Sequence, residues 1–268
     1  MQPDRAALQS TLPPLACSSE GEGPSLLLLH GGAGSRTHWC RNIPALARHF
    51  TVHAFDLPGY GASPNVPKTL TPDDYLDWVA DAAADLDDRI DIAGFSFGGV
   101  VAAGIAARLG RKVRRLSLIG PGGFGNPVGR SIPLRRMPGP DAGEAERRLV
   151  IAYNLGQWML SRAPEPSDPV IDLQWDNIRR TRFDSRTVSL RESITADLSR
   201  ATCPVQLIWG EKDPLAYPSI AARTALCQAV RPDIRVSIVP QAGHWAQFEA
   251  ADPVNSLLIA FHAEETLA

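Results

Sequence analysis

The chain has 268 residues, of which 44% are hydrophobic and 21% are charged. A chain of this length buries roughly three quarters of its extended surface on folding, so it needs no disulfide or metal to be stable. Its 27 Lys and Arg residues against 29 Asp and Glu leave a net charge of −2, which supplies no basic surface for nucleic acid or an anionic membrane. We therefore expect a small-molecule substrate as the partner. The composition does not decide whether the chain forms a homodimer.

The sequence shows no segment that would direct the chain into or across a membrane. The longest apolar stretch, residues 100–107, is much shorter than the roughly 20 residues of a membrane span. Polar and charged residues interrupt any early signal-peptide pattern. The four cysteines lie far apart without CxxC spacing, which is typical of reduced thiols. We expect a cytoplasmic protein.

Short apolar runs alternate with helical periodicity near both ends of the chain. Strands are predicted over 26–29, 51–55, 89–93, 115–119, 205–209 and 235–239. Helices are predicted over 39–50, 71–86, 98–109, 220–230 and 252–261. Such alternation builds βαβ units, so we expect an α/β fold with a mostly parallel sheet and helices on both faces.

Between these two parts the strand-like runs disappear. Gly and Pro crowd the residues just after 120, and helical patterns follow around 144–160 and 169–180. A structureless loop of this length is uncommon in a compact domain, so a helical insertion is the better interpretation. The predicted organisation is a core domain in two parts, residues 1–121 and 201–268, with a helical lid over 122–200.

The segment from Gly94 to Gly98 fits the pattern G-x-S-x-G, with Ser96 at its centre. It follows a predicted strand and precedes a predicted helix, which is the context that a nucleophilic serine on a sharp turn requires. The two glycines leave room for the strained backbone of such a turn. A Gly-rich turn with an incidental serine is the alternative interpretation.

A serine hydroxyl needs a base to activate it and an acid to orient that base. Asp213 and His244 each follow a predicted strand, and the order Ser, Asp, His is the one expected for a doubly wound sheet. Gly32, in a glycine-rich segment after the first strand, and Phe97 are the expected backbone donors of an oxyanion hole. A phosphate-binding loop at 30–37 is disfavoured, because Thr37 stands where G-x-G-x-x-G needs glycine.

These motifs together resemble the α/β-hydrolase superfamily. The resemblance rests on His30-Gly31-Gly32, Asp56-Leu57-Pro58-Gly59-Tyr60-Gly61, Gly94-Phe95-Ser96-Phe97-Gly98-Gly99, Gly210-Glu211-Lys212-Asp213 and Gly243-His244. It implies an eight-stranded, mostly parallel sheet, a lid over the active site and no cofactor. A serine nucleophile argues against the dehalogenase and epoxide hydrolase branches, which use Asp.

Within the superfamily, the run from His244 to Glu249 is similar to that of meta-cleavage-product hydrolases, which cleave C–C bonds. Those enzymes usually have Asn where this chain has Phe95, and a lid arginine where it has Gln174. Three lid arginines are candidates to replace that arginine, namely Arg179, Arg180 and Arg182.

We therefore expect an esterase-like hydrolase, with C–C hydrolysis as the alternative and a low-turnover ligand-binding homologue as the second. The candidate substrate-binding residues are Ala33, Phe95, Phe124, Trp158, Trp175 and Trp245. No metal site is expected, because His49 and His53 straddle a helix end and a strand start and no ligand cluster occurs.

Overall fold

The computed structural model describes residues 12–127, 130–139 and 141–264. Within them a single sheet runs in the order β1-β3-β2-β4-β5-β6-β7, with β1 antiparallel and every other neighbouring pair parallel. The strands are β1 (Cys17–Glu20), β2 (Ser25–Leu29), β3 (Thr51–Phe55), β4 (Ile90–Phe95), β5 (Val113–Ile119), β6 (Val205–Gly210) and β7 (Arg235–Val239). The six predicted strands are confirmed to within two residues.

The described sheet has seven strands rather than the eight that the family resemblance implies. The chain that leads into β1 carries Pro13 and Pro14, which have no N–H to donate to a strand ladder. The described part of this segment, residues 12–16, is therefore not a strand.

The core lies on both faces of the sheet, as the alternation of side chains along β2 shows. Leu27 and Leu29 pack into one apolar cluster and Leu26 and Leu28 into the other, all fully buried. Both faces of a parallel strand are covered by helices, so an uninterrupted leucine run fits this position.

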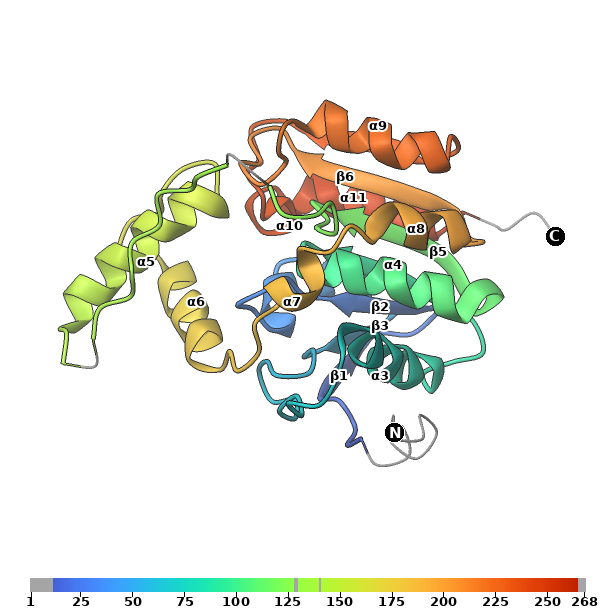
Figure 1. The fold of residues 1–268 in the computed structure, drawn as a ribbon, viewed down its shortest axis with the longest axis horizontal. Helices are drawn as coiled ribbons and strands as arrows, with labels where there is room; N and C mark the ends of the chain where they lie inside the picture. Colours follow the sequence, from blue (N-terminus) through green and yellow to red (C-terminus); the bar gives the residue numbers. More distant parts are fainter. Residues whose placement is uncertain (1–11, 128–129, 140, 265–268) are drawn as a thin grey trace.

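Two helical layers supply the cover (Figure 1). The first cluster is covered by α3 (Pro72–Ala84), α4 (Phe97–Leu109), α8 (Ile194–Arg200) and α9 (Ile220–Val230). The second is covered by α2 (Ile43–Leu46), α10 (Ala246–Glu249) and α11 (Ala251–His262). The predicted helix over 39–50 is instead a 3-10 turn, η1 (Arg36–Trp39), followed by the four-residue α2. Pro44 explains the break, because proline fits only the first turn of a helix.

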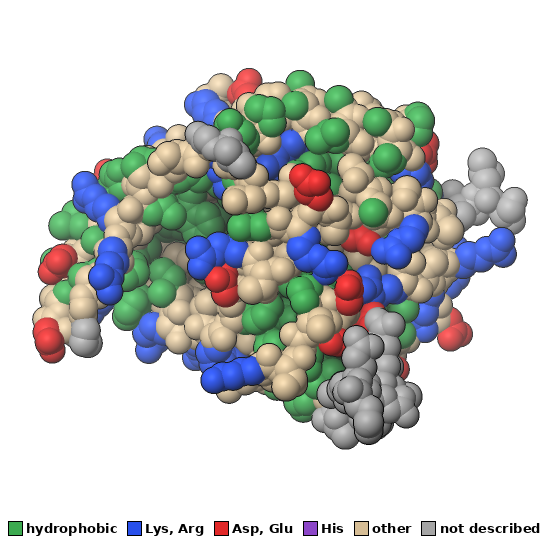
Figure 2. Space-filling view, viewed as in Figure 1, with side chains coloured by type: hydrophobic (Ala, Val, Ile, Leu, Met, Phe, Trp, Pro, Cys, Tyr) green, Lys and Arg blue, Asp and Glu red, His purple; other side chains and the backbone are tan. Residues whose placement is uncertain are grey.

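The segment 122–200 contains α5 (Glu144–Trp158), α6 (Pro169–Arg179), α7 (Arg186–Ser189) and α8. In Figure 1, α5 and α6 stand away from the sheet, on the side of α7 and α10. By contrast, α8 packs on α4 and α9 in the helical layer of the core. Figure 2 shows a hollow lined by hydrophobic side chains between this projecting part and the rest of the molecule.

Candidate functional site

Ser96 lies on a sharp turn at the carboxyl end of β4, directly before α4. Its φ of +54° is one that residues with a side chain rarely adopt. The turn is possible because its neighbours have no Cβ: one on Gly94 would lie 2.3 Å from the Gly98 carbonyl oxygen, and one on Gly98 would lie 2.4 Å from that of Leu29. The backbone therefore presents the Ser96 side chain at the sheet edge where the parallel strands end.

His244 and Asp213 form a buried pair at the same edge of the sheet. The Nδ1 of His244 donates a hydrogen bond to Oδ2 of Asp213 at 2.8 Å, and both residues are almost fully buried. The other carboxylate oxygen of Asp213 accepts the backbone N–H of Leu215 at 2.8 Å. Since a carboxylate only accepts, the proton of a neutral imidazole lies on Nδ1. Its Nε2 is buried and has no hydrogen-bond partner in the described residues, so it remains an available proton acceptor.

Backbone packing around His244 holds this imidazole in place. A Cβ on Gly210, at the end of β6, would lie 1.9 Å from the carbonyl oxygen of Gly243. The carboxylate of Glu249 accepts the N–H of Gly243 at 2.6 Å. The ring of Phe95 packs against the imidazole with centroids 4.9 Å apart. The loop that carries His244 is thereby tied to the ends of two strands.

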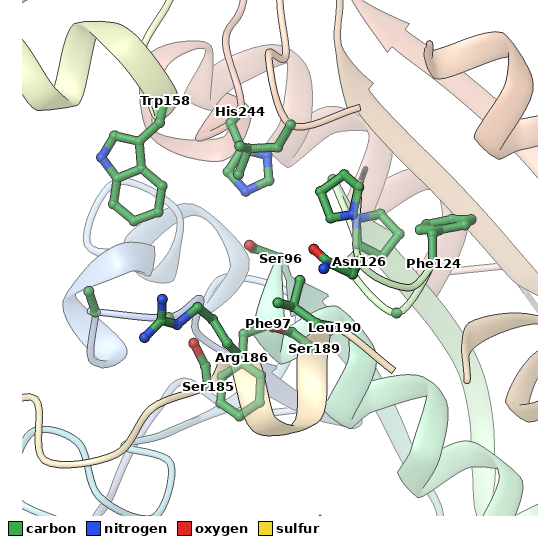
Figure 3. Close-up of a pocket in the computed structure, with 18 of the residues that line it drawn as sticks. Ser96, Phe97, Phe124, Asn126, Trp158, Ser185, Arg186, Ser189, Leu190 and His244 are labelled. Atoms are coloured by element: carbon green, nitrogen blue, oxygen red, sulfur yellow. The ribbon is translucent and has the colours of Figure 1, made fainter. Parts of the chain in front are cut away.

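A pocket of about 580 Å³ opens above these residues and has a mainly apolar lining. The predicted site residues that line it are Gly32, Ala33, Ser96, Phe97, Phe124, Trp158 and His244. Figure 3 shows Ser96 between Trp158 on one side and Asn126 and Phe124 on the other. Asp213 reaches the pocket only through His244.

The two predicted oxyanion donors lie in suitable backbone settings. Phe97 is the first residue of α4, and the first N–H groups of a helix have no partner within it. Gly32 faces the pocket beside Ser185, whose Oγ would lie 2.6 Å from a Cβ at this position. Both N–H groups therefore belong to backbone that borders the same cavity as Ser96.

Three residues predicted to contact substrate are placed outside the pocket lining. Trp245 is fully buried; its indole N–H donates to the His38 carbonyl at 3.0 Å and its ring stacks on Phe248. Phe95 is the last residue of β4, is fully buried, and its ring packs against the rings of His38 and His244. Trp175 lies on α6 near the guanidinium groups of Arg147 and Arg179. The substrate-contact prediction is corrected for these three, because each ring packs against its own surroundings.

The predicted lid arginines also point elsewhere. Arg179 pairs with Asp176 on the same helix, and Arg182 donates to the Ser63 carbonyl at 2.6 Å. Neither they nor Arg180 lines the pocket. Gln174 is buried, and its amide donates to the Ala33 carbonyl at 3.1 Å. None of the three lid arginines therefore takes the position of a carboxylate-binding lid arginine.

The pocket lining includes polar and aromatic residues that motif reasoning missed: Asn126, Arg130, Ser185, Arg186, Trp209 and Arg223. A signal existed for one of them. Arg223 occupies a core-facing position of α9, on the same buried side as Cys227. A charged residue at a core-facing helix position is unusual and indicates either a buried partner or a site. Trp209 lies near the end of β6, and the others lie in loops or at the start of α7, where no repeating pattern marks them.

Two further histidines beside the site are held neutral. His30 donates from Nδ1 to the Gly31 carbonyl at 2.7 Å and accepts the Leu57 N–H on Nε2 at 2.9 Å. Burial lowers the pKa of His30 to about 4, and burial also lowers the pKa of His38 well below its ordinary value. Both support the loop around Gly31 rather than titrate near neutral pH.

The described ranges contain neither a candidate metal site nor a candidate membrane span. There, no group of three or more His, Cys, Asp or Glu residues is arranged to hold a metal ion. No described helix is both long and apolar enough to cross a membrane.

Comparison with known proteins gives relatives with two kinds of activity. A dihydrolipoyllysine-residue acetyltransferase component of an acetoin cleaving system from Pseudomonas putida is 31% identical over 90% of this chain. The chain spans only 64% of that protein's length. A 2-hydroxy-6-oxononadienedioate/2-hydroxy-6-oxononatrienedioate hydrolase from Comamonas testosteroni is 26% identical over 91% of this chain and 89% of its own.

Solved structures with the same fold include a carboxylesterase from Bacillus subtilis and a meta-cleavage product hydrolase from Pseudomonas fluorescens. The first has a TM-score of 0.70 at 23% identity and covers 93% of this chain and 88% of that one. The second has a TM-score of 0.70 at 22% identity and covers 93% of this chain and 94% of that one. The sequence profile of the alpha/beta hydrolase family matches residues 26–257. Together with the parallel sheet and the turn at Ser96, this match establishes that the chain belongs to the alpha/beta hydrolase family.

Proposed function

We propose that the protein is a serine hydrolase that cleaves an ester-like bond of a small molecule (a carboxylic ester, lactone or thioester) through an acyl-enzyme on Ser96. The observation that carries the proposal is the buried hydrogen bond from His244 to Asp213, which leaves Nε2 as an acceptor in the pocket that Ser96 lines. A volume of about 580 Å³ suits a small-molecule substrate.

In this mechanism the Ser96 hydroxyl attacks the substrate carbonyl while Nε2 of His244 takes its proton. Asp213 keeps the imidazole in the required tautomer and stabilises the imidazolium that forms. The N–H groups of Gly32 and Phe97 stabilise the oxyanion. His244 then gives its proton to the leaving group, and a water molecule activated by the same imidazole releases the acyl group.

The segment 122–200 serves as the lid in this proposal. Its contribution to the pocket includes Phe124 from the chain after β5, Trp158 from the end of α5 and Ser185, which directly precedes α7. A lid of this kind excludes water and sets which acyl and leaving groups fit.

The experiment is the hydrolysis of p-nitrophenyl esters by a Ser96→Ala variant. Removing the nucleophile is expected to lower kcat by on the order of 10⁴-fold or more while substrate binding is retained. Ser256→Ala, which changes an exposed serine on α11, is the matched control and is expected to retain full activity. Turnover of the Ser96→Ala variant near that of the control would refute the proposal. Labelling by a fluorophosphonate without turnover of any ester would instead favour a low-turnover binding homologue.

A C–C hydrolase is the second candidate. The Comamonas testosteroni relative, aligned over most of both chains, is named a 2-hydroxy-6-oxononadienedioate/2-hydroxy-6-oxononatrienedioate hydrolase. The run from His244 to Glu249 is also similar to that of meta-cleavage-product hydrolases, which cleave C–C bonds. The same Ser96 and His244 would then act after ketonisation of a vinylogous 1,5-diketone acid. Comparing kcat/KM for such a ring-fission product with that for an ester separates the candidates. A value for the C–C substrate above that for every ester tested would favour the second.

A further inference from the structure

One end of the pocket contains two arginines that form no ion pair with any carboxylate of the described residues. Arg130 and Arg223 both line the cavity, and within the described ranges neither lies within ion-pair distance of an Asp or Glu. The third pocket arginine, Arg186, is paired with Asp184, to which it donates from Nε at 2.8 Å and from Nη2 at 2.7 Å. The pocket is therefore lined by one guanidinium group that is ion-paired and by two that have no ion-pair partner among the described residues.

Arg223 is the more buried of the two and is only 7% exposed. Its Nε donates to the Tyr217 carbonyl at 2.8 Å, and its guanidinium carbon lies 4.4 Å from the centre of the Phe124 ring. Burial and the neighbouring charge of Arg130 lower the pKa of Arg223 to about 10, so the side chain remains a cation at neutral pH. Its two terminal nitrogens make no hydrogen bond to the described residues.

Arg130 adds a second cation at the same end. Its Nη1 donates to the Leu215 carbonyl at 3.0 Å, so both arginines contact the loop that follows Asp213. The indole N–H of Trp209, whose ring lies beside Phe124, is buried without a partner among the described residues. The charge of Asp213 acts on both arginines. This carboxylate nevertheless forms no ion pair with either of them in the described residues, and its two oxygens accept from His244 and the Leu215 N–H. This end of the pocket is rich in donors and poor in acceptors.

A buried cation without a counter-ion is costly, and an anion that enters beside it relieves that cost. A guanidinium group presents parallel N–H donors that match the two oxygens of a carboxylate. In Figure 3, Phe124 lies on the opposite side of Ser96 from Trp158. Since Phe124 and Ser96 line the same pocket, a molecule that reacts at Ser96 has room to extend toward Phe124 and the two arginines.

We propose that Arg130 and Arg223 form a carboxylate subsite, so that the preferred substrate is an ester or related acyl compound that also carries a carboxylate. This inference rests on the proposed function of the site and names its substrate class. The neutralised Arg186 has no such role.

The wild-type protein provides the first test. The substrates are p-nitrophenyl monoesters of succinate, glutarate and adipate, each paired with the ester in which a primary carboxamide replaces the free carboxylate. Acetyl esters of 4-hydroxybenzoate and 4-hydroxybenzamide place the same pair on the leaving group. We expect at least one carboxylate ester to exceed its amide partner in kcat/KM by about 10-fold to 100-fold, the range of a charge-assisted hydrogen bond. Equal values in every pair would overturn the proposal.

Variants assign the preference to these side chains. Arg223→Gln is expected to remove most of the preference for the carboxylate ester, mainly through KM, while the amide ester is still hydrolysed. Arg130→Gln is expected to reduce the preference in the same direction and serves alone if Arg223→Gln does not fold. Arg186→Gln is the matched control, and its preference should equal that of the wild type. A preference that survives in both Arg130→Gln and Arg223→Gln would contradict the assignment.

A binding measurement separates this inference from the proposed function. Calorimetry with the Ser96→Ala variant is expected to show tighter binding of the carboxylate ester than of its amide partner. If neutral esters are hydrolysed with Ser96 dependence but no pair shows a preference, the subsite is wrong and the serine mechanism stands. If carboxylate binding depends on Arg223 but no ester is hydrolysed, the subsite stands and the ester hydrolase proposal fails.

Discussion

The sheet edge and the projecting helices of 122–200 contribute to the same pocket in different ways. At the sheet edge, backbone packing holds the proposed catalytic groups: the glycines around Ser96 leave no space for a side chain, and the His244–Asp213 pair is buried. On the projecting part, α5 buries only three of its fifteen residues. Its neighbour α6 buries four of its eleven residues, two of them apolar, and contacts the chain after β2 through polar side chains, such as Asn177, which accepts from Ser35 at 2.7 Å.

This difference separates two tasks. Reacting atoms must be held within fractions of an ångström, which a buried sheet edge provides. A substrate has to enter and leave, which favours a cover with fewer buried contacts. We therefore expect changes at the sheet edge to alter chemistry or global stability, and changes in α5 and α6 to alter local stability and substrate preference.

Asp213→Asn is expected to give a large loss of activity, second only to that of Ser96→Ala. An amide at this position no longer holds the proton on Nδ1 of His244, so kcat for an ester should fall by on the order of 10³-fold to 10⁴-fold. The melting temperature and far-UV circular dichroism check that the fold persists. A variant that folds and retains more than a tenth of the activity would contradict the role given to this carboxylate.

Gly210→Ala tests the packing of the sheet edge. Its Cβ would lie 1.9 Å from the Gly243 carbonyl oxygen, so the loop that carries His244 must shift. We expect a loss of about 3 kcal/mol in the free energy of unfolding, measured by urea denaturation, together with a fall in kcat. Gly139→Ala, where no described atom lies within 4 Å of the new Cβ, is the control and should change stability by less than about 0.5 kcal/mol. Similar losses for both would remove the contrast between the two regions.

Acid conditions should destabilise the core through its buried histidines. Burial lowers the pKa of His30 to about 4, and it also lowers the pKa values of His38 and His262. Below about pH 6.5 the unfolded chain binds protons that the folded core does not, so stability rises with pH between about 4 and 6.5 and is lost as the pH falls. For His30 alone, the loss from pH 7 to pH 5 is roughly 2 kcal/mol.

Urea denaturation at pH 7.5 and pH 5.0 measures this effect. In His30→Gln, an amide oxygen can still accept the Leu57 N–H. The free energy of unfolding of this variant should differ less between pH 7.5 and pH 5.0 than that of the wild type, by roughly 2 kcal/mol. An unchanged difference would mean that His30 is protonated in the folded protein.

Helix caps give the smallest and most selective effect. Asp168 caps α6 by accepting the Val170 N–H at 2.9 Å, and Thr71 forms a capping box with Asp74 at the start of α3. Removing either cap with alanine should cost about 1 kcal/mol. Hydrogen exchange should show faster local opening of α6 in Asp168→Ala and a lower global stability in Thr71→Ala. If Asp168→Ala lowers protection throughout the core as well, the two regions unfold as one unit.

Sequence reasoning succeeded where a local pattern has one structural consequence. Buried apolar runs gave the strands, and the spacing of glycines around Ser96 predicted the turn that the structure shows. It failed where side-chain direction depends on distant packing. Trp245 is adjacent to His244, yet it turns away and stacks on Phe248. Arg223 occupies a core-facing position of α9, which indicates a buried partner or a site, but only the folded arrangement of β6, α9 and Phe124 shows that it lines this pocket.

The most direct test of the account is to trap the covalent intermediate and locate it. The protein is mixed with an activated ester, quenched in acid within milliseconds to seconds, digested and examined by tandem mass spectrometry. The account predicts an acyl group on the peptide that contains Ser96, at up to one per chain, formed at least 100-fold more slowly when His244 is replaced by alanine. An enzyme that turns over the ester while the acyl group lies on another residue, with Ser96 unmodified at every quench time, would contradict it.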